Sequence, residues 1–299
     1  MPRDKGLSVF VLGAGKVGRG LTRALRAKGV PVTLRAARRG LPRSIDAGIV
    51  VVAVRDGDVR PLAERLVPVV AKRSVVVHVA GALDAEALAP LRSSCAGIGQ
   101  MHPMIAFAST EFTPSLAQGS MLVRGDPAAV ARGRRLARAL GMVPRTARPL
   151  DVVAYHAAAG LVANGGAALA WLGAELLVVA GIPRATTPKF LGPLLRSVAD
   201  NVEALGFPRA LTGPVRRGDA AALEKHLATL SAKMPRALPL YVTSAWAQLS
   251  LARALGEASK ERYEAIARVL AASGRRLSLS MPPADVRADR DLRRPSDDR

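Results

Sequence analysis

Residues 9–20 read VFVLGAGKVGRG and decide the fold of the chain. The apolar residues 10–12 have the aromatic and β-branched character of a buried strand, and Leu21, Ala24 and Leu25 recur at helical spacing after the glycines. The segment therefore predicts a strand, a tight turn and a helix in direct succession. This order is typical of the first βα unit of a dinucleotide-binding domain.

Each glycine of this turn has a predicted task. Gly13 makes the turn, Gly15 lets the backbone approach a pyrophosphate, and Gly18 lets the helix pack closely on the strand. The phosphates would lie on the N–H groups at the start of the helix, where the helix dipole favours an anion. The alternative is a glycine-rich βα turn that binds no ligand. The predicted phosphate loop consists of Gly13, Ala14, Gly15, Lys16, Val17 and Gly18.

The end of the second predicted strand, residues 31–34, indicates which dinucleotide fits. An Asp or Glu there would bind the ribose 2′-hydroxyl of NAD(H), but this chain has neither. It has Arg35, Arg38 and Arg39, whose guanidinium groups suit a 2′-phosphate. We therefore predict NADP(H) as the cofactor. The alternative is that these arginines lie on the surface of an arginine-rich chain and bind no phosphate.

Two further buried strands are predicted within residues 46–54 and 74–79, which are continuous apolar runs. The segments just past such strands lie against the cofactor in a Rossmann sheet. His78, at the end of the second of these strands, is predicted to contact the cofactor. The alternative is that its side chain belongs to the apolar core. The predicted cofactor contacts at these two strand ends are Ala53, Val54, Arg55, His78 and Gly81.

A histidine followed by a proline, His102-Pro103, stands in the next predicted strand and loop, residues 97–108. Proline is unsuited to a central ladder position, so His102 is predicted at the end of its strand, where open α/β sheets bind their ligands. The alternative is a histidine whose ring is satisfied by backbone groups in a turn. We take His102 as a candidate catalytic residue.

Strand patterns stop near Pro149 and helical patterns take over. We predict an α/β fold with a Rossmann NADP-binding domain over residues 1–149 and an all-helical substrate and dimerisation domain over 150–281. The tail, residues 282–299, is rich in Asp, Arg and Pro and lacks apolar periodicity, which predicts disorder. Asp151 is predicted to cap the first long helix of the second domain.

That helix carries one polar set among apolar residues. His156, Gly160 and Asn164 follow at i, i+4 and i+8 and share a face, with about 12 Å along the axis between the first and the last. Imidazole titrates near neutral pH, so His156 is a candidate general acid, while Asn164 would hold the far end of a substrate. The alternative for His156 is a helix histidine at a domain junction.

A polar loop, residues 207–219, reads FPRALTGPVRRGD and offers a place for a carboxylate. Two neighbouring arginines in it could clamp a substrate carboxylate through bidentate hydrogen bonds. A capping and turn role for the loop is the alternative. The candidate substrate-binding residues are Thr212, Arg216 and Arg217.

Composition narrows the classes of partner. The net charge of +21 comes from arginines spread along the whole chain, and no basic stretch carries the aromatic residues that stack bases. We therefore predict no nucleic-acid partner. A single cysteine, Cys95, rules out an internal disulfide and a cysteine metal cluster, and we predict no metal site.

Residues 157–182 form a long, mostly apolar stretch with the length of a membrane span. Asn164, Glu175 and five glycines within it favour a buried central helix instead. The first residues, MPRDKGLS, pass into the first strand without the apolar segment of a secretion signal. We therefore expect a cytoplasmic protein without membrane contact.

Five segments together resemble one family: GAGKVG, HVAGAL, GQMHPMIAFA, YHAAAGLVAN and ALTGPVRRGD. Up to its tail, the chain is similar to the Rossmann-like family whose C-terminal part is catalogued as domain of unknown function 2520. That family is similar to ketopantoate reductases, pyrroline-5-carboxylate reductases and other 6-phosphogluconate-dehydrogenase-like enzymes. The resemblance implies a nicotinamide cofactor, an all-helical second domain, a cleft between the two domains and a homodimer formed by the apolar helices.

Two sets of relatives bear on the candidate catalytic residues. Ketopantoate reductases carry a catalytic lysine on the corresponding helix, with asparagines four and eight residues later. This chain has His156 at the lysine position, Gly160 at the first asparagine and Asn164 at the second. The HPM segment also resembles that of prephenate dehydrogenases, whose histidine there is catalytic, although the second half of the chain does not resemble theirs.

These patterns and the resemblance lead to one expectation for the activity. We expect an NADPH-dependent reductase that transfers hydride to a small 2-keto acid, with ketopantoate as the most specific candidate. The alternatives are an imine reductase of the pyrroline-carboxylate kind, a prephenate-dehydrogenase-like enzyme, and a sensor that binds NADP(H) without catalysis.

Overall fold

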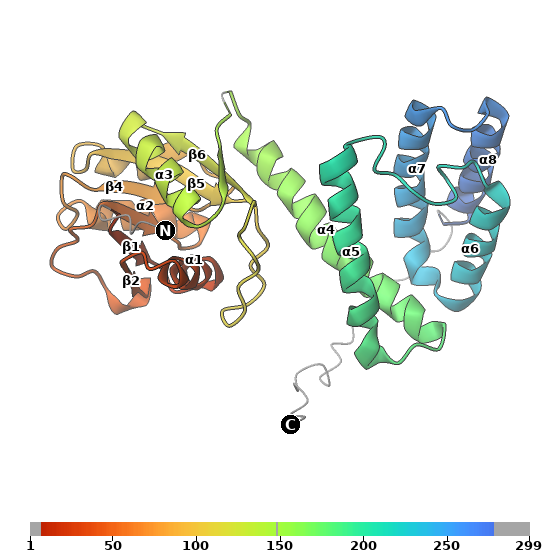
Figure 1. The fold of residues 1–299 in the computed structure, drawn as a ribbon, viewed down its shortest axis with the longest axis horizontal. Helices are drawn as coiled ribbons and strands as arrows, with labels where there is room; N and C mark the ends of the chain where they lie inside the picture. The colour runs from red at the N-terminus through yellow and green to blue at the C-terminus, as the bar shows by residue number, and fades with distance from the viewer. Residues whose placement is uncertain (1–6, 148, 278–299) are drawn as a thin grey trace. The chain divides into compact units, whose positions relative to one another are not determined.

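The computed structural model describes residues 7–147 and 149–277, so the predicted disordered tail lies outside the described residues. The chain divides into two compact units between Ala167 and Ala168 (Figure 1). The division falls inside the long helix α4 (Val152–Val179) rather than at the predicted boundary. Residues of the first turn of α4 contact the sheet of the first unit, which explains the difference.

A seven-stranded sheet in the order β2-β1-β3-β4-β5-β6-β7 forms the first unit. Neighbouring strands run parallel, except that β6 is antiparallel to β5. This is the predicted α/β Rossmann architecture, and the prediction of fold class is confirmed. The strands are β1 (Val9–Leu12), β2 (Val32–Arg35), β3 (Ile49–Val52), β4 (Val75–His78), β5 (Gly97–Pro103), β6 (Ser120–Gly125) and β7 (Val143–Arg145).

Apolar side chains cover both faces of this sheet. One core cluster includes Val11 and Val51 with Leu136 of a helix, and the other includes Val50 with Leu62 of another helix. Successive strand residues point to opposite faces, so a strand covered on both sides needs the unbroken apolar run seen in β3. The helices of this unit are α1 (Lys16–Ala27), α2 (Asp56–Leu66) and α3 (Pro127–Ala139), with short 3₁₀ turns η1 (Ala37–Arg39) and η2 (Ala85–Leu91).

The carboxyl ends of the parallel strands meet at one edge of the sheet. Leu12, Val52, His78 and Gln100 lie in a single row across β1, β3, β4 and β5. Beyond that row β5 pairs, among the described strands, with β6 alone, so His102 lies at the carboxyl edge of the sheet, next to Gly81 in the segment that follows β4. This register places the predicted site segments on one side of the sheet.

Over the part that the structure describes, residues 168–277, helices alone form the second unit, as predicted. Helices α6, α7 and α8 pack side by side around a core that includes Leu223, Leu249 and Ile266 (Figure 1). The second half of α4 contributes Leu172 and Leu176 to a smaller apolar cluster with α6. The helices are α5 (Thr187–Leu205), α6 (Ala220–Lys233), α7 (Leu238–Leu255) and α8 (Lys260–Leu277), with η3 (Arg184–Thr186) and η4 (Pro235–Ala237) between them.

The expectation of a buried central helix at residues 157–182 is wrong for a single copy of the chain. No described residue of α4 is buried, and Leu161, Val162 and Trp171 are exposed. By length and composition, α4 is the one helix among the described residues that could cross a membrane. Part of the apolar surface of α4, including Leu161, Val162 and Trp171, is therefore left exposed by the described part of the chain.

Candidate active site

Two glycines of the turn after β1, Gly13 and Gly18, lie where no side chain fits. Gly13 has a φ of +121°, and a Cβ on it would lie 2.1 Å from the carbonyl oxygen of Ala53. A Cβ on Gly18 would lie 1.9 Å from the carbonyl oxygen of Gly13, so helix α1 packs directly on the turn. The N–H of Gly13 also donates to the carbonyl oxygen of Arg35 at 2.8 Å. The turn is thus tied to the ends of both neighbouring strands.

The start of helix α1 has the properties of an anion site. Gly15 is the N-cap, no side chain caps the helix, and the first turn holds no acidic residue. A Cβ on Gly15 would meet no atom within 4 Å, so the backbone there is open to a close approach. Lys16 is exposed beside it. Uncapped N–H groups, the helix dipole and a nearby cation together fit a pyrophosphate.

Three arginines follow the end of β2, and they have different surroundings. The guanidinium group of Arg35 donates to the carbonyl oxygens of Gly40 at 2.7 Å and of Arg39 at 2.9 Å, which shapes the turn around η1. Arg38 and Arg39 are exposed on that turn. Arg38 and Arg39 therefore expose their side chains to solvent, while Arg35 supports the turn that carries them.

Between β3 and α2, the segment predicted to flank the cofactor lies beside the glycine turn. The N–H of Ala53 donates to the carbonyl oxygen of Leu12 at 2.8 Å. Val54 is half-buried, and the exposed Arg55 pairs with Asp58 at 3.1 Å. The backbone of Ala53 is therefore the part of this segment closest to a ligand on the turn.

His78 is completely buried at the end of β4. Its Nε2 lies 2.7 Å from the carbonyl oxygen of Asp84, and its Nδ1 has no hydrogen-bond partner among the described residues. Burial lowers the pKa of His78, so its ring is neutral at neutral pH. His78 thus holds the segment after β4 in place, and a contact between its ring and a cofactor would require that segment to open.

The two predicted catalytic histidines, His102 and His156, meet above Gly81. The ring centroids of His102 and His156 are 5.8 Å apart, and the Tyr155 hydroxyl lies 3.1 Å from Nδ1 of His102. A Cβ on Gly81 would lie 2.3 Å from Nδ1 of His156 and 2.8 Å from Nε2 of His102. With the two rings in these positions there is no room for a Cβ, so Gly81 forms the floor of the histidine pair.

The sequence did not single out two residues of this arrangement, Tyr155 and Gln100. Gln100 is fully buried, and its Nε2 donates to the carbonyl oxygens of Ala80 at 3.0 Å and of Gly81 at 3.4 Å. It thereby holds the backbone beneath the two histidines. A lone amide in an apolar strand was the available signal for Gln100, and for Tyr155 it was the position directly before His156.

The surroundings of His102 keep its ring uncharged. Burial, with the neighbouring rings of His156 and His78, lowers the pKa of His102 to about 4. At pH 7 its Nδ1 therefore shares one hydrogen bond with the Tyr155 hydroxyl, whose own pKa is raised by burial. His156 is exposed at the same edge. The two histidines thus differ in burial and in the roles that they can take.

The depressed pKa of His102 makes the stability of the fold depend on pH. The unfolded chain takes up this proton near pH 6.5 and the folded chain only near pH 4, so protons favour unfolding in that interval. Between pH 7 and pH 4.5, the free energy of unfolding of the wild type should therefore fall. We expect this fall to be about 2 kcal/mol larger in the wild type than in His102→Gln. Urea denaturation at both pH values measures this difference, and parallel pH profiles would contradict the assignment.

Asn164 and Gly160 continue the face of α4 that begins at His156. Asn164 is exposed, and its Nδ2 lies 3.9 Å from the position of a Cβ on Gly160. The missing side chain at Gly160 thus leaves room beside the Asn164 amide. The predicted polar face of this helix is present.

The arginines of the 207–219 loop belong to the second unit. Arg216 donates to both carboxylate oxygens of Glu257, at 2.7 and 2.6 Å, and its Nη1 donates to the carbonyl oxygen of Leu211 at 2.6 Å. A substrate carboxylate at Arg216 would therefore have to displace Glu257. Thr212 and Arg217 are exposed on the loop.

Comparison with known proteins gives one family match and a set of structural neighbours. Residues 120–247, from β6 into α7, match the model of a family described as Domain of unknown function (DUF2520). No curated protein matches the sequence.

The structural neighbours share the fold at low sequence identity. A protein from Bacteroides fragilis, provisionally named an NADP oxidoreductase, is 20% identical with a TM-score of 0.64, over 82% of this chain and 98% of that chain. A protein from Thermotoga maritima is 21% identical with a TM-score of 0.60, over the same shares. A 1-pyrroline-5-carboxylate reductase from Streptococcus pyogenes is 17% identical with a TM-score of 0.52, over 81% and 99%.

Proposed function

We propose that this protein is an NADPH-dependent reductase of a small 2-keto acid, in which His156 donates the proton. One observation carries the proposal: the uncapped glycine turn and the histidine pair above Gly81 lie at the same carboxyl edge of one sheet. In α/β sheets of this kind, ligands bind at the carboxyl edge of the strands. The fold, shared with structures named as an NADP oxidoreductase and a 1-pyrroline-5-carboxylate reductase, supports the same class.

NADPH fits the residues at this edge. The open backbone at Gly15 and the uncapped start of α1 would hold the pyrophosphate. Arg38 and Arg39 would bind the 2′-phosphate, and the backbone at Ala53 would flank the ribose. When bound, the cofactor supplies the hydride.

His156 supplies the proton that carbonyl reduction requires. Hydride addition to a carbonyl carbon leaves negative charge on oxygen, which a positioned acid neutralises. His102 is neutral at pH 7 and hydrogen-bonded to Tyr155, so it orients the substrate rather than acting as an imidazolium. Asn164 lies two turns further along the same face of α4, where it would bind the distal part of the substrate.

A carbonyl group is a better substrate for this site than an imine. A protonated imine already carries its proton on nitrogen, so hydride addition leaves a neutral amine and needs no further acid. A carbonyl group lacks that proton, so the placed histidine fits C=O reduction, and ketopantoate is our first candidate. A cyclic imine of the pyrroline-carboxylate kind is the second, because the fold is shared with an enzyme that reduces one.

We also propose that the working form is a cytoplasmic homodimer. Apolar side chains are exposed along α4 and α5, including Leu161, Trp171 and Phe190. Exposed apolar patches on a folded chain mark interaction sites, and a second copy would cover them by pairing the same surface of each chain. Light scattering of the purified protein gives the mass, and a monomer at micromolar concentration would contradict the dimer.

Two measurements on the purified protein test the proposed activity. The first is a titration with NADPH and with NADH, and the second follows NADPH oxidation with ketopantoate, pyrroline-type imines and common 2-keto acids. Turnover of a 2-keto acid supports the proposal, and turnover of an imine alone replaces it with the second candidate. Tight NADPH binding without turnover of any of these compounds would instead favour a sensor of NADP(H).

Removal of the Arg38 guanidinium should alter cofactor preference. A hydrogen-bonded ion pair with phosphate contributes about 2 kcal/mol, so Arg38→Gln should raise the Kd for NADPH roughly 30-fold. The Kd for NADH, which lacks the 2′-phosphate, should change less than 3-fold. Arg65→Gln, which removes an exposed arginine from the last turn of α2, is the charge-matched control. Equal weakening of both nucleotides would contradict the 2′-phosphate assignment.

A further inference from the structure

A cavity of about 270 Å³ lies beside η2 in the first unit. Its described lining residues come from η2 with the two residues that flank it, and from the end of β6 up to the N-cap of α3. None of them is assigned to the cofactor or the substrate of the proposed reaction. The charged lining residues are Asp84, Glu86, Arg92, Arg124 and Asp126.

Three of these charged residues already pair with one another. Arg92 donates from Nη2 to the carboxylate of Glu86, and from Nη1 to the carboxylate of Asp126 at 3.0 Å. The second oxygen of Asp126, Oδ2, accepts the N–H of Ile98 at 3.0 Å. The charges of this group are therefore largely balanced within the protein.

Arg124 differs from this group, because its guanidinium is enclosed without being paired. Its Nε and Nη1 are buried, and neither has a hydrogen-bond partner among the described residues. A buried N–H without an acceptor is unfavourable, because it has lost its hydrogen bonds to water and has not replaced them. Arg124 therefore needs an acceptor that the cavity admits.

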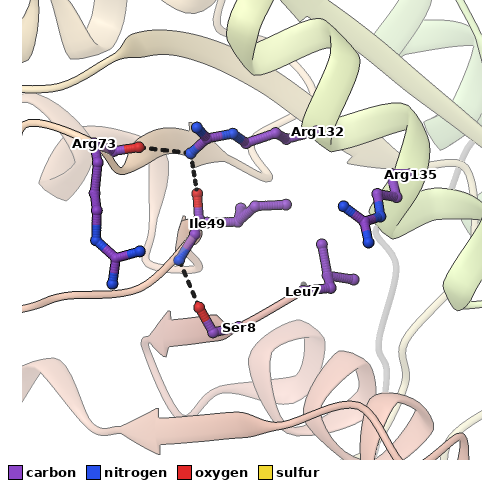
Figure 2. Close-up of a pocket in the computed structure, with 7 residues that line it drawn as sticks. Leu7, Ser8, Ile49, Arg73, Arg132 and Arg135 are labelled. Carbon is purple, nitrogen blue, oxygen red and sulfur yellow. Dashed lines mark hydrogen bonds between the residues drawn. The ribbon is translucent and has the colours of Figure 1, made fainter. Parts of the chain in front are cut away.

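Another arginine of the first unit shows how the fold satisfies such a group. Arg132 on α3 donates from Nη1 to the carbonyl oxygens of Gly48 at 2.8 Å and of Arg73 at 2.6 Å (Figure 2). No carbonyl of the described chain takes this part for Nε and Nη1 of Arg124. The Gln100 side chain lies directly opposite Arg124 in the sheet, yet its buried Oε1 also has no partner within the described ranges.

A carboxylate without a cationic partner lines the same cavity. Asp84 is the N-cap of η2, where its Oδ1 accepts the N–H of Glu86 at 3.0 Å, and it forms no ion pair with the residues that the structure describes. Its carbonyl oxygen lies 2.7 Å from Nε2 of the buried His78, which fixes the backbone there. The described lining thus contains a guanidinium and a carboxylate that pair neither with each other nor with a neighbouring charge.

We propose that this cavity binds a small zwitterion of the amino-acid class, with its carboxylate on Arg124 and its ammonium group on Asp84. Guanidinium groups suit carboxylates, and carboxylate oxygens accept hydrogen bonds from ammonium groups. The cavity is several times larger than one bound water requires, so it admits a molecule with several heavy atoms. The site does not depend on the proposed reductase activity, because it uses none of the residues assigned to it.

Titration calorimetry with glycine, β-alanine and 4-aminobutyrate tests this site, since these zwitterions differ in the distance between their two charges. Acetate, propionate and butyrate are the matching probes that lack the ammonium group. Arg124→Gln removes the guanidinium, and Asp84→Asn removes the negative charge while keeping an acceptor for the N-cap. Arg134→Gln is the control, because Arg134 is exposed on α3 and does not line the cavity.

We expect at least one zwitterion to bind the wild type and the control saturably and with equal affinity. Each cavity variant should weaken that binding about 10-fold, as expected for the loss of a charged hydrogen bond. The matching carboxylate should bind the wild type about 10-fold more weakly than the zwitterion does, and Asp84→Asn should not change its affinity. Equal melting temperatures show that the variants fold, and the exposed position of Asp84 keeps the test valid if Arg124→Gln is unstable.

Four results would overturn the proposal. The first is no binding of any of the three zwitterions, which would leave the cavity to water. The second is equal binding by the wild type and the folded cavity variants. The third is a carboxylate that binds as tightly as its zwitterion, which would show a simple anion site. The fourth is an equal loss in Arg134→Gln, which would show a general effect of net charge.

Discussion

Replacing His156 by alanine is expected to lower kcat by two to four orders of magnitude, the usual contribution of a positioned general acid. The ring of His156 lies exposed at the carboxyl edge of the sheet, while its neighbour His102 is kept neutral by burial. His102 therefore cannot replace the lost proton donor at pH 7. The Kd for NADPH should change by less than 3-fold, because no predicted cofactor contact involves the ring.

The matched control for this experiment is His226→Ala. His226 lies on α6 in the second unit, forms a hydrogen bond with the Tyr241 hydroxyl at 2.8 Å, and is not among the residues assigned to the reaction. Its removal should leave kcat unchanged. Single-turnover measurements at saturating NADPH separate the chemical step from product release. If His156→Ala retains wild-type kcat, the assignment of the proton donor is incorrect.

Gly18→Ala is expected to produce the largest loss of stability among the glycine substitutions in the turn. The added Cβ would lie 1.9 Å from the carbonyl oxygen of Gly13, and a backbone atom cannot move aside as a flexible side chain can. Helix α1 must therefore shift away from the turn. We expect the free energy of unfolding to fall by about 3 kcal/mol and NADPH binding to be lost.

Two other glycines separate the effect on folding from the effect on binding. Gly15→Ala adds a Cβ that meets no atom, so stability should change little while NADPH binding weakens at least 10-fold. Gly57→Ala places a methyl group in open space on α2 and should leave NADPH binding unchanged. Thermal melting and NADPH titration of the three variants check this. A stable Gly18→Ala protein with normal affinity would contradict the packing described for the turn.

The sequence predicted the sheet well because local patterns encode it. The apolar run at residues 46–54 predicts a strand buried on both faces, and β3 lies within it. Asp151 predicts a helix start, and its carboxylate accepts the N–H groups of Val153 and Ala154. Such signals come from neighbours in sequence, so no knowledge of distant contacts is needed to read them.

Burial and long-range pairing were harder to predict. His78 and His102 have similar apolar neighbours in sequence, yet one is enclosed beneath the segment that follows β4 and the other stands at the sheet edge. The bidentate ion pair between Arg216 and Glu257 joins residues 41 positions apart, and no local sequence pattern predicts it. The exposure of α4 also has no local signal, since a buried helix and an exposed apolar helix have the same composition.

The sequence by itself determined the elements: the glycine turn, the arginines that follow the second strand, the order of strands and helices, and the polar face of α4. Only the tertiary structure decided which of these elements meet. The register of β4 and β5 sets Gly81 beside His102, and the first turn of α4 then brings Tyr155 and His156 onto them. The reason is physical: local periodicity selects helix or strand, whereas a side-chain contact depends on how whole elements align and pack.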